Sequence, residues 1–478
     1  MSAISYSVFG VTGFAYKLPS FLFTILGTYS TYRLGKSLYN SEVGRLAALI
    51  VASAFAYLLA NNDVRMDAIL TASVVFATWQ LVEWVNTKSL LNVIGAALGL
   101  ALGFCTKGHI AVFTAAVGIL FYILYKKDWK SLYHWHLLVL ILAFAFFISP
   151  VVYCYYLQYD LHPEKVIRGK SGRSGVEFIL WKQNFERFQG ESFGTEAKND
   201  YLFFFHSFLW AFAPWSILAF VAFFKRLRSF ASRQYEWLTI GTFAVMALMI
   251  TFSGFKLPHY LNIIFPVAAV LTASYLVEKR EQGRSLKGLL VTQIILCVLC
   301  LLLTAVVNVW AFPVSKPFVI FGFLFLLGFC VSFLLRLKSN LQKLVGASAI
   351  TSMLVFYLLN ANFYPQLLTY QGGNQLAFAT KGKVDPKYVY FWPGTYSSSY
   401  NFYTSELRKE FADTVLQQPS PIWIMADNTG LDQIKQKGLP LIETIEQEDY
   451  EITTLQLPFI NPATRQKELN KLVLVRVK

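Results

Sequence analysis

The sequence predicts an α-helical polytopic membrane protein that ends in a small α/β domain. Of its 478 residues, 55% are hydrophobic and only 14% are charged, and the mean hydropathy is +0.47. A water-soluble enzyme of this length needs far more polar surface than this composition supplies. Residues 361–478 differ from the rest, because they carry 12 basic and 12 acidic residues between short apolar runs.

Twelve apolar stretches predict membrane-spanning helices, since about 20 apolar residues cross the hydrocarbon core as a helix. They lie near 18–35, 44–60, 67–85, 92–106, 109–125, 136–156, 204–224, 236–253, 259–277, 288–310, 317–335 and 343–360. We therefore expect a transmembrane domain at 1–360, which includes a long polar loop at 157–201, and a soluble domain at 361–478.

The soluble domain is expected to combine strands and helices. Short β-like runs predict strands at 388–392, 422–426, 440–445, 450–457 and 472–477. Helix-like segments lie near 397–414 and 430–437. The whole sequence contains no GxGxxG, P-loop, HExxH or GxSxG motif, so nucleotide cradling, zinc proteolysis and serine-hydrolase chemistry have no support.

Basic residues in alternate loops predict the topology. One set of loops carries 18 Lys and Arg residues, whereas the intervening short loops carry 4, which are Arg65, Lys107, Lys256 and Lys316. Cytoplasmic loops are enriched in basic residues, so the 18-residue set is expected inside and the loop around Asp67 outside. The net charge of +15 then reports topology, and no nucleic-acid partner is predicted.

The stretch Asn61–Leu70 places Asp63, Arg65 and Asp67 between two long apolar runs. Ionisable residues at such a position usually serve a function, although a polar turn that only ends two helices is the alternative. Further polar groups are expected on the same side of the membrane. They are Lys107, His109, the basic run Lys165–Arg173, Arg187, Lys256, His259 and Tyr260.

Together these residue types suit a reaction that needs a base and a cationic environment for a phosphate. A carboxylate near a hydroxyl or amine acceptor can take its proton. Lys and Arg side chains can hold the phosphate of a lipid-linked donor, whose negative charge grows as its bond to a sugar breaks.

Several motifs follow one another in the first 277 residues. They are FGVTGFAYKLPS at 9–20, RMDA at 65–68, GFCTKG at 103–108, WKQNFERF at 181–188 and KLPHY at 256–260. In this order they resemble the GT-C glycosyltransferases of family 39. The bacterial branch of that family includes the lipid A aminoarabinose transferases and relatives of the dolichyl-phosphate-mannose protein mannosyltransferases.

The resemblance implies transfer of a sugar from a polyprenyl-phosphate donor to a lipid or protein acceptor, with inversion. The reaction would take place on the non-cytoplasmic face of the plasma (inner) membrane. Asp67 matches the second outward-loop acid of the family and is the expected catalytic residue. The expected substrate-binding residues are Arg65, Lys107, Arg187, Lys256, His259 and Tyr260.

The sequence departs from the family pattern at two places. Family members usually begin with one more transmembrane helix and an outward loop with an acidic pair, followed by Lys-Pro before the helix that starts here near Lys17. We expect the DNA upstream of Met1 to encode these features; a truncated gene and a true short form are the alternatives. Asn184 stands where the aminoarabinose transferase has a histidine, which counts against a metal site. The sequence establishes no cofactor, and the resemblance leaves room for a divalent metal ion.

Two other functions stay compatible with the sequence. One is a non-catalytic membrane scaffold whose outward domain binds a partner, and the other is a lipid-phosphate transporter or flippase. Transporters usually show internal repeats and charges at the membrane midplane on broken helices. The two halves of this sequence show no repeat, and nearly every ionisable residue lies at the end of an expected helix.

The charge asymmetry predicts that the C-terminal domain, from about Asn362, lies outside the cytoplasm. A reporter enzyme that works only outside the cytoplasm, fused after Lys478, is expected to be active. Its counterpart that works only in the cytoplasm is expected to be silent. The opposite pattern would invert every assignment of a residue to the outer face.

Overall fold

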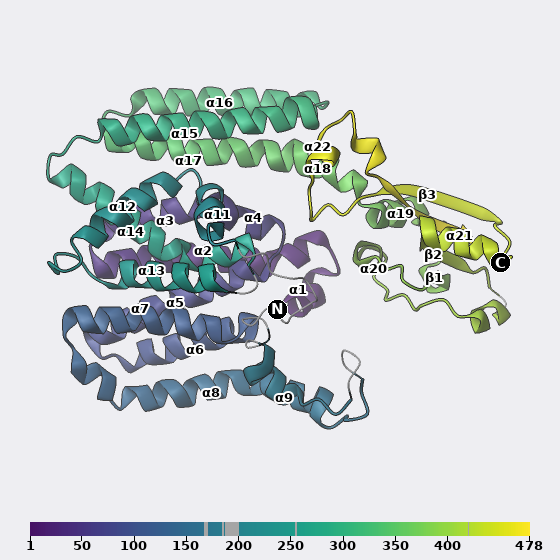
Figure 1. Ribbon diagram of the computed structural model, residues 1–478, viewed down its shortest axis with the longest axis horizontal. Helices are drawn as coiled ribbons and strands as arrows, with labels where there is room; N and C mark the ends of the chain where they lie inside the picture. The colour runs from purple at the N-terminus through teal and green to yellow at the C-terminus, as the bar shows by residue number, and fades with distance from the viewer. Residues whose placement is uncertain (167–170, 184–185, 187–199, 254–255, 419) are drawn as a thin grey trace. The chain divides into compact units, whose positions relative to one another are not determined.

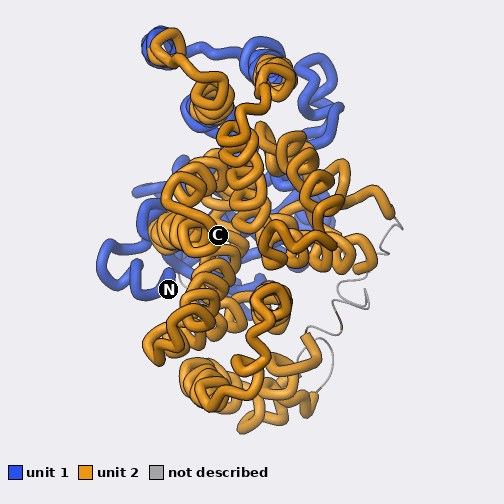
Figure 2. Tube along the Cα trace, turned by 90° about the vertical axis from the view of Figure 1, so that its left-hand side faces the viewer, with its two compact units in different colours: residues 1–16, 299–332, 354–478 blue, residues 17–298, 333–353 orange. Residues whose placement is uncertain are grey.

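The computed structural model describes residues 1–166, 171–183, 186, 200–253, 256–418 and 420–478, most of them helical (Figure 1). The chain divides into two compact units (Figure 2). Unit 1 comprises residues 1–16, 299–332 and 354–478, and unit 2 comprises residues 17–298 and 333–353. The expected boundary after residue 360, between a transmembrane and a soluble domain, stays a prediction.

The α-helices follow one another along most of the chain (Figure 1). They are α1 (Ser2–Phe9), α2 (Gly13–Leu38), α3 (Ser41–Ala52), α4 (Phe55–Asn62), α5 (Met66–Thr87), α6 (Leu90–Lys107), α7 (His109–Lys126), α8 (His136–Tyr155), α9 (Gly175–Glu177), α11 (Phe203–Ala211), α12 (Ser216–Arg228), α13 (Leu238–Phe252), α14 (Phe265–Glu281), α15 (Lys287–Val306), α16 (Pro317–Arg336), α17 (Asn340–Leu358), α18 (Tyr364–Leu367), α19 (Gly372–Thr380), α20 (Ser398–Thr404), α21 (Asn428–Gln436) and α22 (Leu457–Ile460).

The expected spans fall on helices, which confirms the polytopic helical fold class. Among the described residues, 8 helices are long and apolar enough to cross a membrane, or 9 if the bent pair α3–α4 is one span. The sequence-based number of spans is higher because α2 carries many polar side chains and because α11, α12 and α13 have 9, 13 and 15 residues.

Two of the expected spans are broken, which the sequence analysis did not predict. α3 and α4 meet at an angle of 54°. The stretch 204–224, expected as one span, is divided between α11 and α12, with residues 212–215 between them. Pro214 lies in that gap, where it has no backbone N–H to donate to a continuing helix.

The two breaks lie against each other. The backbone N–H of Phe55 donates to the carbonyl oxygen of Ala213 at 3.0 Å. In the other direction, the indole N–H of Trp215 donates to the hydroxyl oxygen of Ser53 at 2.9 Å. Each break therefore supplies polar partners that the other lacks within its own helix, a condition for irregular backbone at membrane depth.

Two further helices complete the hydrogen bonding of this junction. The Ser352 hydroxyl of α17 donates to the carbonyl oxygen of Ser53 at 2.7 Å. The Gln293 side-chain amide of α15 donates to the carbonyl oxygen of Pro214 at 2.6 Å. We call the contacts among Ser53, Phe55, Ala213, Pro214, Trp215, Gln293 and Ser352 the break junction.

α5 and α6 pack closely along their length because glycines of α6 face α5. A Cβ atom at Gly99 would lie 2.9 Å from the ring of Phe76 and 3.0 Å from Ala77. Small residues at such a contact allow two helix backbones to approach. The pair is antiparallel, so the beginning of α5 and the end of α6 lie at the same end.

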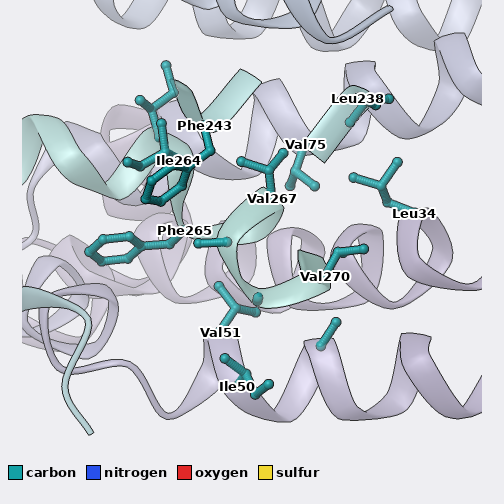
Figure 3. Packing of buried hydrophobic residues seen from close by; sticks show 14 of the residues in the cluster. Leu34, Ile50, Val51, Val75, Leu238, Phe243, Ile264, Phe265, Val267 and Val270 are labelled. Atoms are coloured by element: carbon teal, nitrogen blue, oxygen red, sulfur yellow. The ribbon is translucent and has the colours of Figure 1, made fainter. Parts of the chain in front are cut away.

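The core of unit 2 surrounds α14. In the most apolar 18 residues of Pro258–Glu281, 89% of the residues are buried, a larger share than in the other long apolar helices. Figure 3 shows its side chains among residues of α2, α3, α5 and α13; the labelled ones are Leu34, Ile50, Val51, Val75, Leu238, Phe243, Ile264, Phe265, Val267 and Val270. This packing fixes the beginning of the segment, where part of the candidate site lies.

Unit 1 contains one four-stranded sheet in the order β1-β2-β4-β3. Its strands are β1 (Val389–Phe391), β2 (Trp423–Asp427), β3 (Glu443–Asp449) and β4 (Asn470–Arg476). β1 pairs with β2 in parallel, and β4 pairs with β2 and β3 in antiparallel orientation. With α19, α20 and α21, the sheet confirms the expected α/β character.

The expected strand at 450–457 is not formed, and the helix expected near 397–414 is confined to α20. β3 ends at Asp449. The backbone N–H of the next residue, Tyr450, does not continue the strand pairing but donates to the carbonyl oxygen of Tyr370 at 2.8 Å. The ring of Tyr450 stacks on Phe459, with 3.7 Å between the ring centroids. Tyr450 and Ile452 therefore pack in an irregular cluster with Phe459, which alternation alone does not distinguish from a strand.

The break junction predicts a stability cost for Ser352→Ala. This change leaves the buried carbonyl oxygen of Ser53 without the hydroxyl donor of Ser352, which should lower the free energy of unfolding by about 1–3 kcal/mol. Thermal or denaturant unfolding in detergent measures the loss. Ser149→Ala is the matched control, because that exposed hydroxyl bonds only within α8 and its removal should change little.

Candidate active site at the helix ends

The structure brings six of the residues named from the sequence together where helical segments of unit 2 end. The connection between α4 and α5, the first turn of α5, the last residue of α6 and the 3-10 helix η4 (Pro258–Ile264) contribute them. The members of this six-residue cluster are Asp63, Arg65, Asp67, Lys107, His259 and Tyr260. All six lie on the side that the sequence analysis expects to face outward.

Asp67 and Lys107 form a buried ion pair. The ammonium nitrogen of Lys107 lies 2.7 Å from Oδ1 of Asp67, and the two side chains are 10% and 4% exposed. Asp67 lies in the first turn of α5 and Lys107 in the last turn of α6. Each charge is favourable at its helix end, because the helix dipole is positive at the N-terminus and negative at the C-terminus.

His259 lies between Arg65 and Asp67. Its Nδ1 atom is 3.0 Å from Nη1 of Arg65, and its Nε2 atom is 3.9 Å from Oδ2 of Asp67. Arg65 also contacts Asp63, with 3.0 Å between Nε and Oδ2. Arg65, in the short connection before α5, therefore contacts both His259 of η4 and the neighbouring Asp63.

Tyr260 completes the cluster through its ring. The Lys107 ammonium group lies 4.6 Å from the centroid of that ring, a distance at which the ring face attracts a cation. The ring is also perpendicular to that of His259, with 5.1 Å between centroids. Lys107 is thus held on one side by a carboxylate and on another by an aromatic face.

Lys256 makes different contacts. Its ammonium group donates to the carbonyl oxygen of Asp200 at 2.8 Å and lies 5.5 Å from the ring centroid of Tyr201. The Asp200 carboxylate pairs with Nε2 of His206 at 2.6 Å, and this hydrogen bond lowers the pKa of Asp200 below its ordinary value. Lys256 therefore lies beside an ionised carboxylate, in contacts separate from those of the cluster.

Some expected site residues lie outside the described residues. They are Arg187 and Asn184, together with residues 167–170 of the basic run. Lys165, at the beginning of that run, donates to the carbonyl oxygen of Gln158 at 2.9 Å. His109 stacks on Trp181 of the short π-helix η3 (Phe178–Lys182), with 5.2 Å between ring centroids.

The described residues provide no group of three or more His, Cys, Asp or Glu side chains placed to hold a metal ion. Within the cluster, the oxygen and nitrogen atoms of Asp63, Asp67 and His259 contact Arg65 and Lys107. A divalent metal therefore stays an expectation from the resemblance alone.

The sequence predicts the members of the cluster but not how they pair. It predicts Arg65 and Lys107 as cations toward a phosphate, whereas each contacts a carboxylate. With two acids, two bases and one histidine, the cluster is nearly balanced in charge. The pairing could have been inferred from the alternation Asp63-Val-Arg65-Met-Asp67, because it places one carboxylate near Arg65 and a second one that is available to Lys107.

The buried ion pair predicts a large cost for Lys107→Met. Removal of one partner leaves Asp67 as an uncompensated buried charge, which typically costs about 3–5 kcal/mol. The double variant Asp67→Asn with Lys107→Met should recover most of that loss in unfolding measurements. As a control, Arg280→Met at the exposed pair with Glu42 should cost at most about 1 kcal/mol. Equal losses at the two sites would show that the Asp67 pair is not buried as described.

The comparison with known proteins gives matches along most of the chain. The sequence profile of the family described as dolichyl-phosphate-mannose-protein mannosyltransferase matches residues 1–153. An undecaprenyl phosphate-α-4-amino-4-deoxy-L-arabinose arabinosyl transferase of Proteus mirabilis is 23% identical over 280 residues, 58% of this chain and 48% of its own length. A namesake from Pseudomonas fluorescens is 27% identical over 377 residues, 76% of this chain and 64% of its own length.

The fold has a solved counterpart. The crystal structure of ArnT from Cupriavidus metallidurans bound to undecaprenyl phosphate superposes with a TM-score of 0.71 at 13% identity, covering 99% of this chain and 86% of that one. The apo structure of the same protein gives the same TM-score of 0.71. The chain spans about half the length of the first curated relatives it matches. It therefore resembles the GT-C glycosyltransferases of family 39 and has the fold of an aminoarabinose transferase.

Proposed function

We propose that the protein is a membrane glycosyltransferase that transfers a sugar from a polyprenyl phosphate to a lipid or protein acceptor, with inversion. The fold and the names of its relatives support this class of reaction. The observation that carries the proposal is the buried carboxylate of Asp67, held by Lys107 beside His259 and Tyr260.

Asp67 has the chemistry of an acceptor-activating group. In a single displacement, the acceptor oxygen attacks the anomeric carbon and its proton passes to the Asp67 carboxylate. The bond from the anomeric carbon to the phosphate oxygen breaks, and its electron pair stays on the phosphate. Lys107 donates to Oδ1 of Asp67, and Oδ2 lies on the side of His259, so Oδ2 is the atom that we assign to the substrate.

The phosphate needs positive charge that the balanced cluster does not offer in surplus. Lys256 is the described cation best suited to supply it, because it is bound to a backbone carbonyl oxygen and an aromatic ring. Arg187 is expected to act with it from the sequence resemblance. Binding of the donor would replace the contact between Lys256 and Asp200 with a charge-assisted hydrogen bond to phosphate.

The chemistry of the break junction favours a glycosyltransferase over a transporter. Broken helices in transporters commonly place ion or substrate sites at the midplane. Here the groups at the breaks are hydroxyl, indole and amide groups that bond to backbone or to one another. Among the described contacts of the junction there is no ionisable group, which favours a structural role for the breaks.

We also propose that the cluster and the C-terminal domain face the non-cytoplasmic side of the inner membrane. The distribution of basic residues supports this orientation. Several members of the 18-residue set pair at the opposite ends of the same helices: Lys88 with Asp128, Arg226 with Glu278, and Arg280 with Glu42. The two kinds of loop are thus separated by the length of a helix.

Asp67→Asn should lower the rate of sugar transfer by about 10²–10⁴-fold, the usual contribution of a general base. Purified protein with a polyprenyl-phosphate sugar and an outer-leaflet lipid acceptor provides the assay. Asp128→Asn is the matched control, because that acid also pairs with a lysine at 2.7 Å, at the opposite helix ends. Transfer by Asp67→Asn at the rate of the unmodified protein would remove Asp67 from the mechanism.

Lys256→Ala should mainly raise the donor concentration that half-saturates transfer, because its point charge already binds the phosphate before the reaction. The competing interpretation is a lysine that only extends its charged group to the membrane surface. Lys316→Ala is the control, since this lysine also lies in a short outward loop. Identical donor dependence in both variants would favour the competing interpretation.

A further inference from the structure

The protonation of His259 follows from its partners. A guanidinium group has only N–H donors and no acceptor. Because Nη1 of Arg65 lies 3.0 Å from Nδ1 of His259, Nδ1 must accept that hydrogen bond and carries no proton. The imidazole is therefore neutral, and its proton is on Nε2. Arg65 fixes this tautomer through the nitrogen that faces away from Asp67.

The Nε2–H group of His259 points toward the carboxylate of Asp67 but forms no direct hydrogen bond with it. The distance from Nε2 to Oδ2 is 3.9 Å, which is too long for a direct hydrogen bond. The other oxygen of Asp67 is bonded to Lys107 at 2.7 Å. One donor and one acceptor thus face each other at a separation that a single oxygen atom could bridge, about 2.8 Å from each.

The polarity of this pair selects the bridging group. The bridging atom must accept from Nε2–H and donate to the carboxylate of Asp67. A hydroxyl group does both. An ionised phosphate oxygen has no proton to donate and would meet the negative carboxylate, and an ammonium group has no lone pair for His259. Water has the same polarity as a hydroxyl, so a hydroxyl can displace it without loss of hydrogen bonds.

We propose that His259 and Asp67 together bind a hydroxyl group of a substrate, with Arg65 as the positioning residue that sets the polarity. This inference rests on the proposed glycosyltransferase function. The hydroxyl belongs to the donor sugar or to the acceptor, and the two sources share the same chemistry. We call the space between Nε2 and Oδ2 the hydroxyl slot.

The first test determines the tautomer of His259 by NMR and needs no measurement of sugar transfer. The full chain, labelled with ¹⁵N-histidine and held in nanodiscs, contains 6 histidines, and the His259 signals are those lost in His259→Gln. Long-range ¹⁵N–¹H correlation should show a neutral ring protonated on Nε2. Arg65→Ala should yield a mixture of tautomers, whereas the control His162→Gln should leave the His259 signals unchanged. A proton on Nδ1, or a cationic ring, overturns the proposal.

The second test measures binding of undecaprenyl phosphate and of undecaprenyl-phosphate mannose to the full chain. If the slot takes a sugar hydroxyl, His259→Ala should weaken binding of the mannose lipid roughly threefold to tenfold, the usual effect of one hydrogen bond, and leave the bare phosphate lipid unaffected. If it takes the acceptor hydroxyl, both bindings should stay constant and release of mannose to water should slow by a similar factor.

His259→Gln separates this role from simple packing. The amide nitrogen of Gln reaches the position of Nε2, so this variant should recover most of the lost binding or turnover. The amide of His259→Asn reaches only the position of Nδ1, so that variant should not. Equal loss with bare undecaprenyl phosphate, or no loss in any measurement, overturns the hydroxyl slot.

The outcomes also distinguish failure of the hydroxyl slot from failure of the proposed glycosyltransferase function. If the unmodified protein binds neither lipid and releases no sugar, the proposed function fails. The position of the proton on His259 still tests the polarity of the slot in that case, because a proton on Nδ1 or a cationic ring removes the arrangement of donor and acceptor that the slot needs.

Discussion

The candidate site depends on the ion pair of Asp67 and Lys107. It joins the beginning of α5 to the end of α6 through two nearly buried side chains, and such a pair is costly to bury unless both charges are compensated. The close packing of α5 and α6 at Gly99 brings the Lys107 ammonium group within 2.7 Å of the Asp67 carboxylate. Tyr260 contributes by covering the ammonium group. The pair engages Oδ1 of Asp67, and the proposed mechanism assigns the substrate to the other oxygen.

The two broken spans are linked to the placement of the candidate site. The break at Ser53 lets α4 turn toward the connection that carries Asp63 and Arg65, and the break at Pro214 supplies its hydrogen-bond partners. Because every backbone group at membrane depth needs a partner, neither break would be stable alone. The central helix α14, with η4 at its beginning, is held by the same core (Figure 3).

Much of this architecture could be predicted from the sequence. Apolar stretches located the helices. The polar stretch Asn61–Leu70 named Asp63, and motif positions named the other five members of the six-residue cluster. The breaks could not be predicted, because Ser53 and Ala54 are ordinary helix residues whose irregular backbone is stabilised by Trp215 and Ser352 from distant segments. The pairing was hidden for the same reason: Arg65 and His259 are 194 positions apart. The run from Tyr450 has strand-like alternation yet packs on Phe459 instead.

In the proposed mechanism Asp67 acts in a single displacement, in which its carboxylate takes a proton and never bonds to the sugar. The alternative chemistry for a carboxylate in this position is nucleophilic attack on the anomeric carbon, which gives two displacements. The anomeric configuration of the product, determined by NMR after transfer from a polyprenyl-phosphate sugar of known configuration, tests this most directly. The proposed mechanism predicts inversion. Retention of configuration would contradict it.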